Sequence, residues 1–181
     1  TGNFGNILAA YYAKKMGLPI NKLICASNVN KVLTDFIETG VYDRNRDFYA
    51  TCSPSMDILI SSNLERLLYM ITDQNDAQIR EWFGSLAETG RYEVTDDVKK
   101  VLKEEFFGGY CDDEQTKATI SEIYKKYSYT CDTHTAVAVK VYEDYKKATG
   151  DETKTLIAST ASPYKFSASA VSYTHLTLPT T

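Results

Sequence analysis

The feature that most constrains the fold is a short apolar run, KLICAS, at residues 22–27. It is bounded by polar residues, and an apolar run of this length is typical of a strand buried on both faces of a parallel sheet. A helical pattern precedes it at residues 5–16, where Gly17 and Pro19 end the helix. A second helical pattern follows it and ends at Gly40. Because parallel strands are joined through helices, this order predicts an α/β fold with a parallel sheet.

Apolar spacing also predicts a second strand near the far end and a helix-rich middle. The run KTLIAST at residues 154–160 has the character of KLICAS and predicts that second strand. Between the two runs, apolar residues recur at helical spacing in the segments 56–71, 75–90, 96–110, 112–127 and 133–148. Gly108 and Gly109 are expected to end the third of these helices. We therefore expect βα units at both ends and a largely helical insert at about residues 56–130.

Composition and motif spacing exclude several classes of protein. The net charge is −4 and the isoelectric point is about 5.2, whereas a nucleic-acid-binding domain carries a basic patch. No apolar run approaches the roughly 20 residues of a membrane-spanning helix. The four cysteines lack C-x-x-C spacing, and the one credible histidine, His134, stands outside any cluster of ligands. We therefore expect a globular protein without a metal site.

The opening stretch TGNFGN, residues 1–6, combines two glycines with amide side chains directly before a helix. Glycine lets backbone N–H groups approach an anion, and a helix N-terminus adds unpaired donors and a favourable dipole. Asn3 and Asn6 add side-chain donors. The stretch is neither a G-x-G-x-x-G fingerprint nor a Walker loop. It therefore indicates either an ordinary turn or a phosphate-binding loop.

The two ends of the chain do not read as those of a complete protein. The first residue, Thr1, lies inside a motif, and the last residues, VSYTHLTLPTT at 171–181, abandon the amphipathic pattern before them. That string resembles the translation of a sequencing adapter. We expect residues 1–170 to be part of a longer protein and residues 171–181 to be a non-native tail.

Several ordered motifs together resemble one enzyme family. They are TGNFGNILAAYYAKKMGLPINKLICASNVNKVL, SPSMDILISSNLERLLY, DTHTAVAVKVYEDY and STASPYKF, and together they extend over essentially all of residues 1–170. This combination is similar to threonine synthases of the branch shared by bacteria and fungi, which are fold-type II enzymes dependent on pyridoxal 5'-phosphate. The resemblance implies the C-terminal part of a cytoplasmic, monomeric enzyme that converts O-phospho-L-homoserine and water to L-threonine and phosphate.

The resemblance also implies which residues hold the cofactor. Its phosphate is expected in the opening loop, and its pyridine nitrogen is expected to face the hydroxyl of Thr160, with Ser159 as the second candidate. Thr160 is equally suited to cap the helix that follows it. The expected cofactor-binding residues are Gly2, Asn3, Phe4, Gly5, Asn6 and Thr160.

The same resemblance leaves the chain without the family's Schiff-base lysine. That lysine belongs to a Phe-Lys-Asp segment, which is absent from the sequence, and Lys165 is not its equivalent. We therefore assign no catalytic residue and expect the 181-residue chain to have no threonine synthase activity by itself.

Four residues are candidates for substrate binding: Ser55, Asn63, Arg66 and His134. Arginine suits bidentate recognition of phosphate, although most helix-surface arginines are only solvated. His134 follows Thr133 where the family usually has proline. It could contact the substrate or a phosphate, or it could be a first-turn helix residue bonded to a backbone carbonyl. Two alternatives remain for the whole protein: another fold-type II lyase such as threonine dehydratase, against which the helical insert argues, and a non-catalytic phosphate-binding module, which would need a complete sheet.

Overall fold

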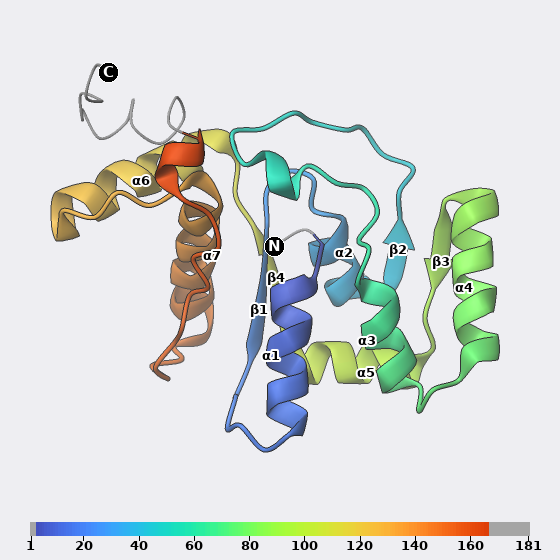
Figure 1. The fold of residues 1–181 in the computed structure, drawn as a ribbon. Coiled ribbons are helices and arrows are strands. Elements are labelled where there is room, and N and C mark those ends of the chain that lie inside the picture. Colours follow the sequence, from blue (N-terminus) through green and yellow to red (C-terminus); the bar gives the residue numbers. More distant parts are fainter. Residues whose placement is uncertain (1–2, 167–181) are drawn as a thin grey trace.

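The computed structural model describes residues 3–166, which form an α/β fold (Figure 1). The predicted class is therefore confirmed. The helices are α1 (Gly5–Lys15), α2 (Val32–Thr39), α3 (Leu64–Ile71), α4 (Asp76–Thr89), α5 (Asp96–Glu105), α6 (Asp113–Tyr127) and α7 (Thr133–Thr149). The strands are β1 (Leu23–Ser27), β2 (Val41–Asp43), β3 (Arg91–Glu93) and β4 (Phe106–Tyr110), and short 3₁₀ turns span Pro54–Met56 and Pro163–Phe166.

Strands β1 and β4 pair in parallel, from Leu23 opposite Phe106 to Ser27 opposite Tyr110. β1 corresponds to the run KLICAS, so this predicted strand is confirmed. Alternate residues of the pair enter two hydrophobic clusters: one is shared with α1, α2 and α5, and the other with α7. The pair is thus enclosed by helices on both faces, as the continuous apolar run predicts.

Strand β4 replaces the end of a predicted helix. The sequence pattern extends the helix that begins at Asp96 as far as Gly108, but the helix ends at Glu105 and FFGGY is a strand. The two glycines serve close packing on opposite faces. A Cβ atom at Gly108 would lie 2.9 Å from Thr34 Cα, and a Cβ atom at Gly109 would lie 2.5 Å from Val141 Cγ1. They make room for α2 and α7 against the strand rather than ending a helix.

The second predicted strand, at residues 154–160, is not formed within the described chain. This stretch has no regular secondary structure, and the side chain of Leu156 is 95% exposed. It runs back along α7 towards the 3₁₀ turn at Pro163–Phe166 (Figure 1). An apolar run forms a strand only where a neighbouring strand supplies hydrogen-bond partners. Within residues 3–166 no strand pairs with this stretch.

The helix predicted for residues 56–71 begins only at Leu64. Upstream of it the chain is held in an irregular path by tertiary hydrogen bonds. The hydroxyl of Tyr42 donates to Leu59 O at 3.1 Å and accepts from Ser61 N at 2.9 Å. Such bonds take the place of the helical ladder, so the local pattern overestimates the helix.

A second, antiparallel pair, β2–β3, was not predicted from the sequence and carries an aromatic cluster. Tyr42 and Tyr92 stack with their ring centroids 5.3 Å apart, and Trp82, Phe83 and Phe36 surround them. Aromatic rings bury a large apolar area with few rotatable bonds. This cluster therefore gives a rigid base to the loop that Tyr42 holds. No helix within residues 3–166 combines the length and apolar character needed to span a bilayer.

Candidate active site at the carboxyl edge of the parallel sheet

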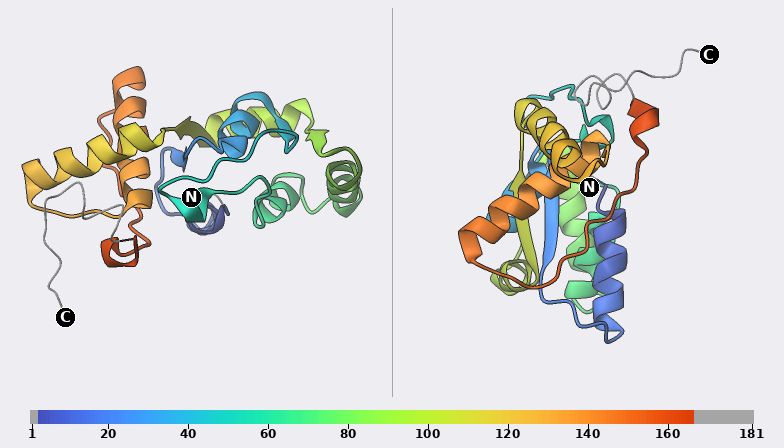
Figure 2. Two further views of the ribbon diagram at one scale, coloured as in Figure 1. Left: turned by 90° about the horizontal axis from the view of Figure 1, so that it is seen from above. Right: turned by 90° about the vertical axis from the view of Figure 1, so that its left-hand side faces the viewer.

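Four segments meet beyond the carboxyl ends of β1 and β4 (Figure 2, left). They are the start of α1, the residues that follow β1, the irregular segment 49–63, and the start of α7. Hydrogen bonds connect them, between Asn63 and Asn3, between Asn28 and Asp57, and between Ser55 and His134. In open α/β sheets ligands bind beyond the carboxyl ends of the strands, so this edge is the candidate site.

The opening loop is pinned by a buried ring. Phe4 precedes the first helical residue of α1 with a left-handed backbone (φ 59°) and a fully buried side chain. Its ring packs against Phe106 of β4 at a centroid distance of 5.7 Å. A left-handed backbone is rare for phenylalanine and persists only where packing enforces it. Phe4 thus fixes where α1 begins, while Gly2 lies outside the described residues.

The first turn of α1 offers donors to a ligand. Within the described chain no side chain caps this N-terminus, and Gly5 and Asn6 are exposed. Asn63 Nδ2 donates to Asn3 O at 2.7 Å, which holds the incoming backbone next to the start of α3. A rigid loop with unpaired N–H groups at a helix N-terminus is suited to bind an anion.

The start of α7 is capped by a buried carboxylate. Asp132 accepts hydrogen bonds from the backbone N–H groups of His134 (2.9 Å) and Thr135 (3.3 Å) and from the hydroxyl of Thr135. Burial alone would raise the pKa of Asp132, but the hydrogen bonds from His134 and Thr135 outweigh it, so the pKa lies below its ordinary value. The carboxylate is therefore a stable anionic cap.

His134 connects α7 to the segment that contains Ser55. Its Nε2 accepts from Ser55 N at 3.1 Å, and its Nδ1 lies 3.1 Å from Asp132 Oδ1. Because Nε2 accepts a hydrogen bond, the ring is neutral and carries its proton on Nδ1, which donates to Asp132. The ring is 4% exposed. This geometry favours a structural role for His134, but its backbone partner is the N–H group of Ser55 and not the expected carbonyl.

A network of buried amides, missed in the sequence analysis, lies directly beyond β1. Asn28 is 1% exposed and Asn30 is 4% exposed. Both side chains donate to Asp57 Oδ1, at 2.7 and 3.1 Å, and Asn30 Nδ2 also donates to Tyr49 O at 2.8 Å. The available signal was a pair of asparagines at the carboxyl end of a buried strand, where polar side chains serve a site more often than a core.

The remaining candidates differ in their placement. Asn63 lies in the network with Asn3, whereas Arg66 is exposed on α3 and Ser55 is exposed beside His134. Thr160 is exposed in the segment that rises along α7 to the same end of the molecule (Figure 1). Its neighbour Ser159 is hydrogen-bonded to the hydroxyl of Thr135 at 3.0 Å.

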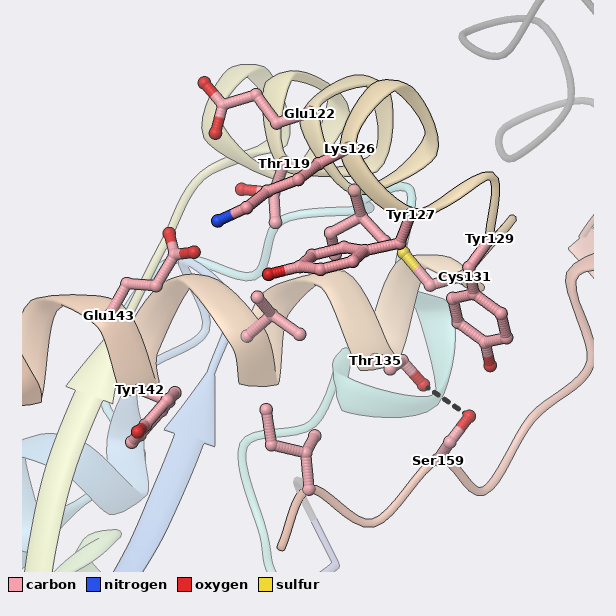
Figure 3. A pocket seen from close by; sticks show the side chains of 13 residues that line it. Thr119, Glu122, Lys126, Tyr127, Tyr129, Cys131, Thr135, Tyr142, Glu143 and Ser159 are labelled. Carbon is pink, nitrogen blue, oxygen red and sulfur yellow. Dashed lines mark hydrogen bonds between the residues drawn. The ribbon is translucent and has the colours of Figure 1, made fainter. Parts of the chain in front are cut away.

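A cavity of about 470 Å³ lies elsewhere, between α6, α7 and residues 157–159 (Figure 3). Tyrosine rings and aliphatic side chains line it, with Lys126, Glu122 and Glu143 at its rim. It shares Thr135 and Ser159 with the site but includes none of the residues of the opening loop. Because it includes none of the backbone N–H groups at the start of α1, we place the candidate site at the sheet edge and not in this cavity.

Comparisons with known proteins find threonine synthases and threonine synthase-like proteins, although no family model matches the chain. Threonine synthase-like 1 of Macaca fascicularis is 44% identical over 172 residues, which are 94% of this chain and 23% of that protein. Threonine synthase of Saccharomyces cerevisiae is 39% identical over 180 residues, covering 92% of this chain and 35% of that protein.

Structural comparison agrees. A crystal structure of threonine synthase from Brucella melitensis, described as bound to pyridoxal phosphate (PLP), superimposes with a TM-score of 0.86 at 36% identity, over 99% of this chain and 38% of that one. The α/β arrangement is therefore a partial threonine synthase fold. The chain covers only 23–35% of the length of the two sequence relatives. It is a homologue of the threonine synthases over that part of their length.

Proposed function

We propose that this chain is the C-terminal part of a PLP-dependent threonine synthase and supplies the cofactor's phosphate site and part of the substrate site. The observation that carries the proposal is the uncapped first turn of α1, fixed by Phe4 at the carboxyl edge of the parallel sheet. It stands in a chain homologous to an enzyme described as PLP-bound.

The residues at this edge fit a phosphate group. The available donors are backbone N–H groups and amide side chains, the partners that phosphate oxygens accept from. A Cβ atom at Gly5 would enter the space in front of Asn63, whose Nδ2 would then lie 3.8 Å away. The space in front of Gly5 is therefore open to a small group next to Asn63.

Each remaining candidate has one role in the proposal. Gly2, Asn3, Phe4, Gly5 and Asn6 form or position the phosphate loop, and Thr160 offers a neutral hydroxyl to the pyridine nitrogen. Arg66, Asn63 and Ser55 bind the anionic groups of the substrate. His134, whose Nε2 accepts from Ser55 N, orients that segment.

The proposed reaction converts O-phospho-L-homoserine and water to L-threonine and phosphate. Bound PLP would supply the electron sink that lets the γ-phosphate leave and water add at Cβ. The chain's own residues would hold the two phosphate groups and exclude bulk water from the sheet edge. We also propose that the whole protein is a cytoplasmic monomer.

The sequence contains no Phe-Lys-Asp segment, so we propose that the catalytic lysine lies outside these 181 residues. The chain by itself should then bind PLP weakly and reversibly and release no phosphate from O-phospho-L-homoserine. The full-length protein that contains this segment should release phosphate and form threonine, and both activities should require PLP.

The experiment measures phosphate and threonine on both proteins, with and without PLP. Turnover without PLP, or release of a keto acid and ammonia from threonine in place of synthesis, would contradict the proposal. PLP binding without turnover of any substrate in the full-length protein would favour a phosphate-binding module.

A further inference from the structure

One carboxylate organises the irregular segment that crosses the candidate site. Asp57 Oδ1 accepts from Asn28 Nδ2 (2.7 Å), Asn30 Nδ2 (3.1 Å) and Thr51 Oγ1 (2.8 Å), and Asp57 Oδ2 accepts from Thr51 N (2.9 Å). These donors come from two different places in the chain. We propose that Asp57 is the positioning residue of the site, which sets where the segment 49–57 lies over the carboxyl edge of the sheet.

The position of this segment matters because it also contacts the helices around the site. Ser55 N donates to His134 Nε2 at 3.1 Å, and Cys52 N donates to the carboxylate of Asp113, at the start of α6, at 3.2 Å. Met56 is 1% exposed and packs in the cluster shared with α7. Asp57 therefore connects the end of β1 to a segment that also touches the starts of α6 and α7.

The geometry leaves the side chain of Ser55 available to a ligand. The hydroxyl of Ser55 makes no hydrogen bond within residues 3–166, although the backbone on both sides is held. By contrast, the hydroxyl of Ser53 lies within 3.1 Å of Asn28 Nδ2 and is buried. Asp57 thus fixes the place of Ser55 without reaching the ligand itself.

A carboxylate is required because every partner of Asp57 is a donor. A carboxylate accepts at both oxygens, whereas an amide presents two N–H donors on one side. Asp57→Asn would set an NH₂ group against the N–H or hydroxyl groups of Asn28, Asn30 or Thr51. It keeps the size of the side chain and removes the match.

This inference rests on the proposed function, and its test uses the full-length protein that contains this segment. Asp57→Asn is expected to raise KM for O-phospho-L-homoserine roughly tenfold with kcat nearly unchanged. Loss of order in the segment 49–57 weakens binding of the ground state and the transition state alike. The matched control is Asp35→Asn, which removes a partly buried carboxylate that lies on α2 and pairs with Arg46 at 2.7 Å and Lys31 at 3.2 Å.

Hydrogen exchange supplies a readout that does not depend on activity. Peptides covering 47–57 should exchange faster in Asp57→Asn than in wild type, while Asp35→Asn leaves them protected. The swap Asn28→Asp with Asp57→Asn, which rebuilds an acid–amide pair with reversed polarity, should recover part of the KM. If Asp57→Asn does not fold, Asn28→Ala, which removes one donor and keeps the carboxylate, should show a smaller rise in KM.

The outcomes separate this inference from the proposed function. Wild-type protein that neither binds PLP nor turns over overturns the function, whereas the exchange result still tests Asp57. Unchanged KM and unchanged exchange in Asp57→Asn overturn the positioning role, as does a fall in kcat at constant KM. Equal effects in Asp35→Asn also overturn it, because they would show general destabilisation.

Discussion

Helices α1 and α7 both begin at the carboxyl edge of the β1–β4 sheet, but their first turns are completed in opposite ways. At α7 the buried carboxylate of Asp132 accepts from two backbone N–H groups, and His134 ties the turn to Ser55. At α1 no described side chain caps the turn, and the loop is fixed from behind by the buried ring of Phe4.

The difference separates stability from binding. The donors of α7 are already used, so its N-terminus contributes to the fold and has little to offer a ligand. The donors of α1 remain available, and apolar packing at Phe4 replaces the missing polar cap in fixing the backbone. A site that binds an anion needs a rigid frame with unused donors, and the two helices provide these separately.

The largest effect should follow from removing the α7 cap. Asp132→Ala leaves buried N–H groups of α7 unpaired and removes the carboxylate that faces His134 Nδ1, so we expect a loss of about 3 kcal/mol in the free energy of unfolding. Urea denaturation measures it. The control, Asp112→Ala, removes the exposed cap of α6 and should lose only about 1 kcal/mol. Equal losses would show that burial of the cap does not matter.

Adding a carboxylate to the first turn of α1 should remove binding without harming the fold. Gly5→Asp places a carboxylate where a bound phosphate is proposed, and its Cβ atom meets only Asn63 Nδ2, at 3.8 Å. We expect PLP affinity of the full-length protein, measured by fluorescence titration, to fall roughly a hundredfold through charge repulsion.

The control for that variant is Gly84→Asp. Gly84 lies on α4, away from the site, and an added Cβ atom there meets nothing within 4 Å. It adds the same charge and should leave PLP affinity unchanged. Unaltered affinity in Gly5→Asp would refute the phosphate loop at α1.

The smallest effect should distinguish the two helices by pH. The folded pKa of Asp132 is lowered, so its stabilisation is complete above the ordinary aspartate pKa of about 3.9 and disappears as the pH falls through the folded value. As the pH falls through that window, the free energy of unfolding of the wild type should decrease by up to about 1.4 kcal/mol per pH unit more than that of Asp132→Ala. Denaturation between pH 2 and 7 measures the difference, and parallel curves would contradict it. Gly5→Asp keeps the Asp132 cap of α7, so the same substitution at Asp132 in that background should still change the pH dependence.

Sequence patterns identify some elements and misassign others for a consistent reason. KLICAS is recognisable because its strand is buried on both faces and its apolar run is unbroken. FFGGY is misassigned because its glycines are needed for close packing against residues distant in sequence. Gly108 packs against Thr34, more than 60 positions upstream, and Gly109 packs against Val141, more than 30 positions downstream, so no local window contains these neighbours. The run at 154–160 is misassigned because a strand needs a partner as well as a pattern.

The candidate site divides in the same way. The glycine–asparagine loop and the ordered motifs are enough to mark residues 3–6, Asn63, Ser55 and His134 as candidates. Asn28, Asn30 and their carboxylate partner could not be connected from the sequence, because their hydrogen bonds join residues 27 to 29 positions apart. Spacing of this kind shows no periodicity.

The sequence by itself determined the α/β class, the buried strand β1, the extent of most helices and the relationship to threonine synthases, because local periodicity and motif order are written along the chain. Only the tertiary structure decided that FFGGY is a strand, that Phe4 anchors α1, and that Asp57 and His134 hold one segment from two sides. These features depend on groups distant in sequence that meet only when apolar faces pack. The free energy of that packing depends on the complete tertiary structure and not on any local segment.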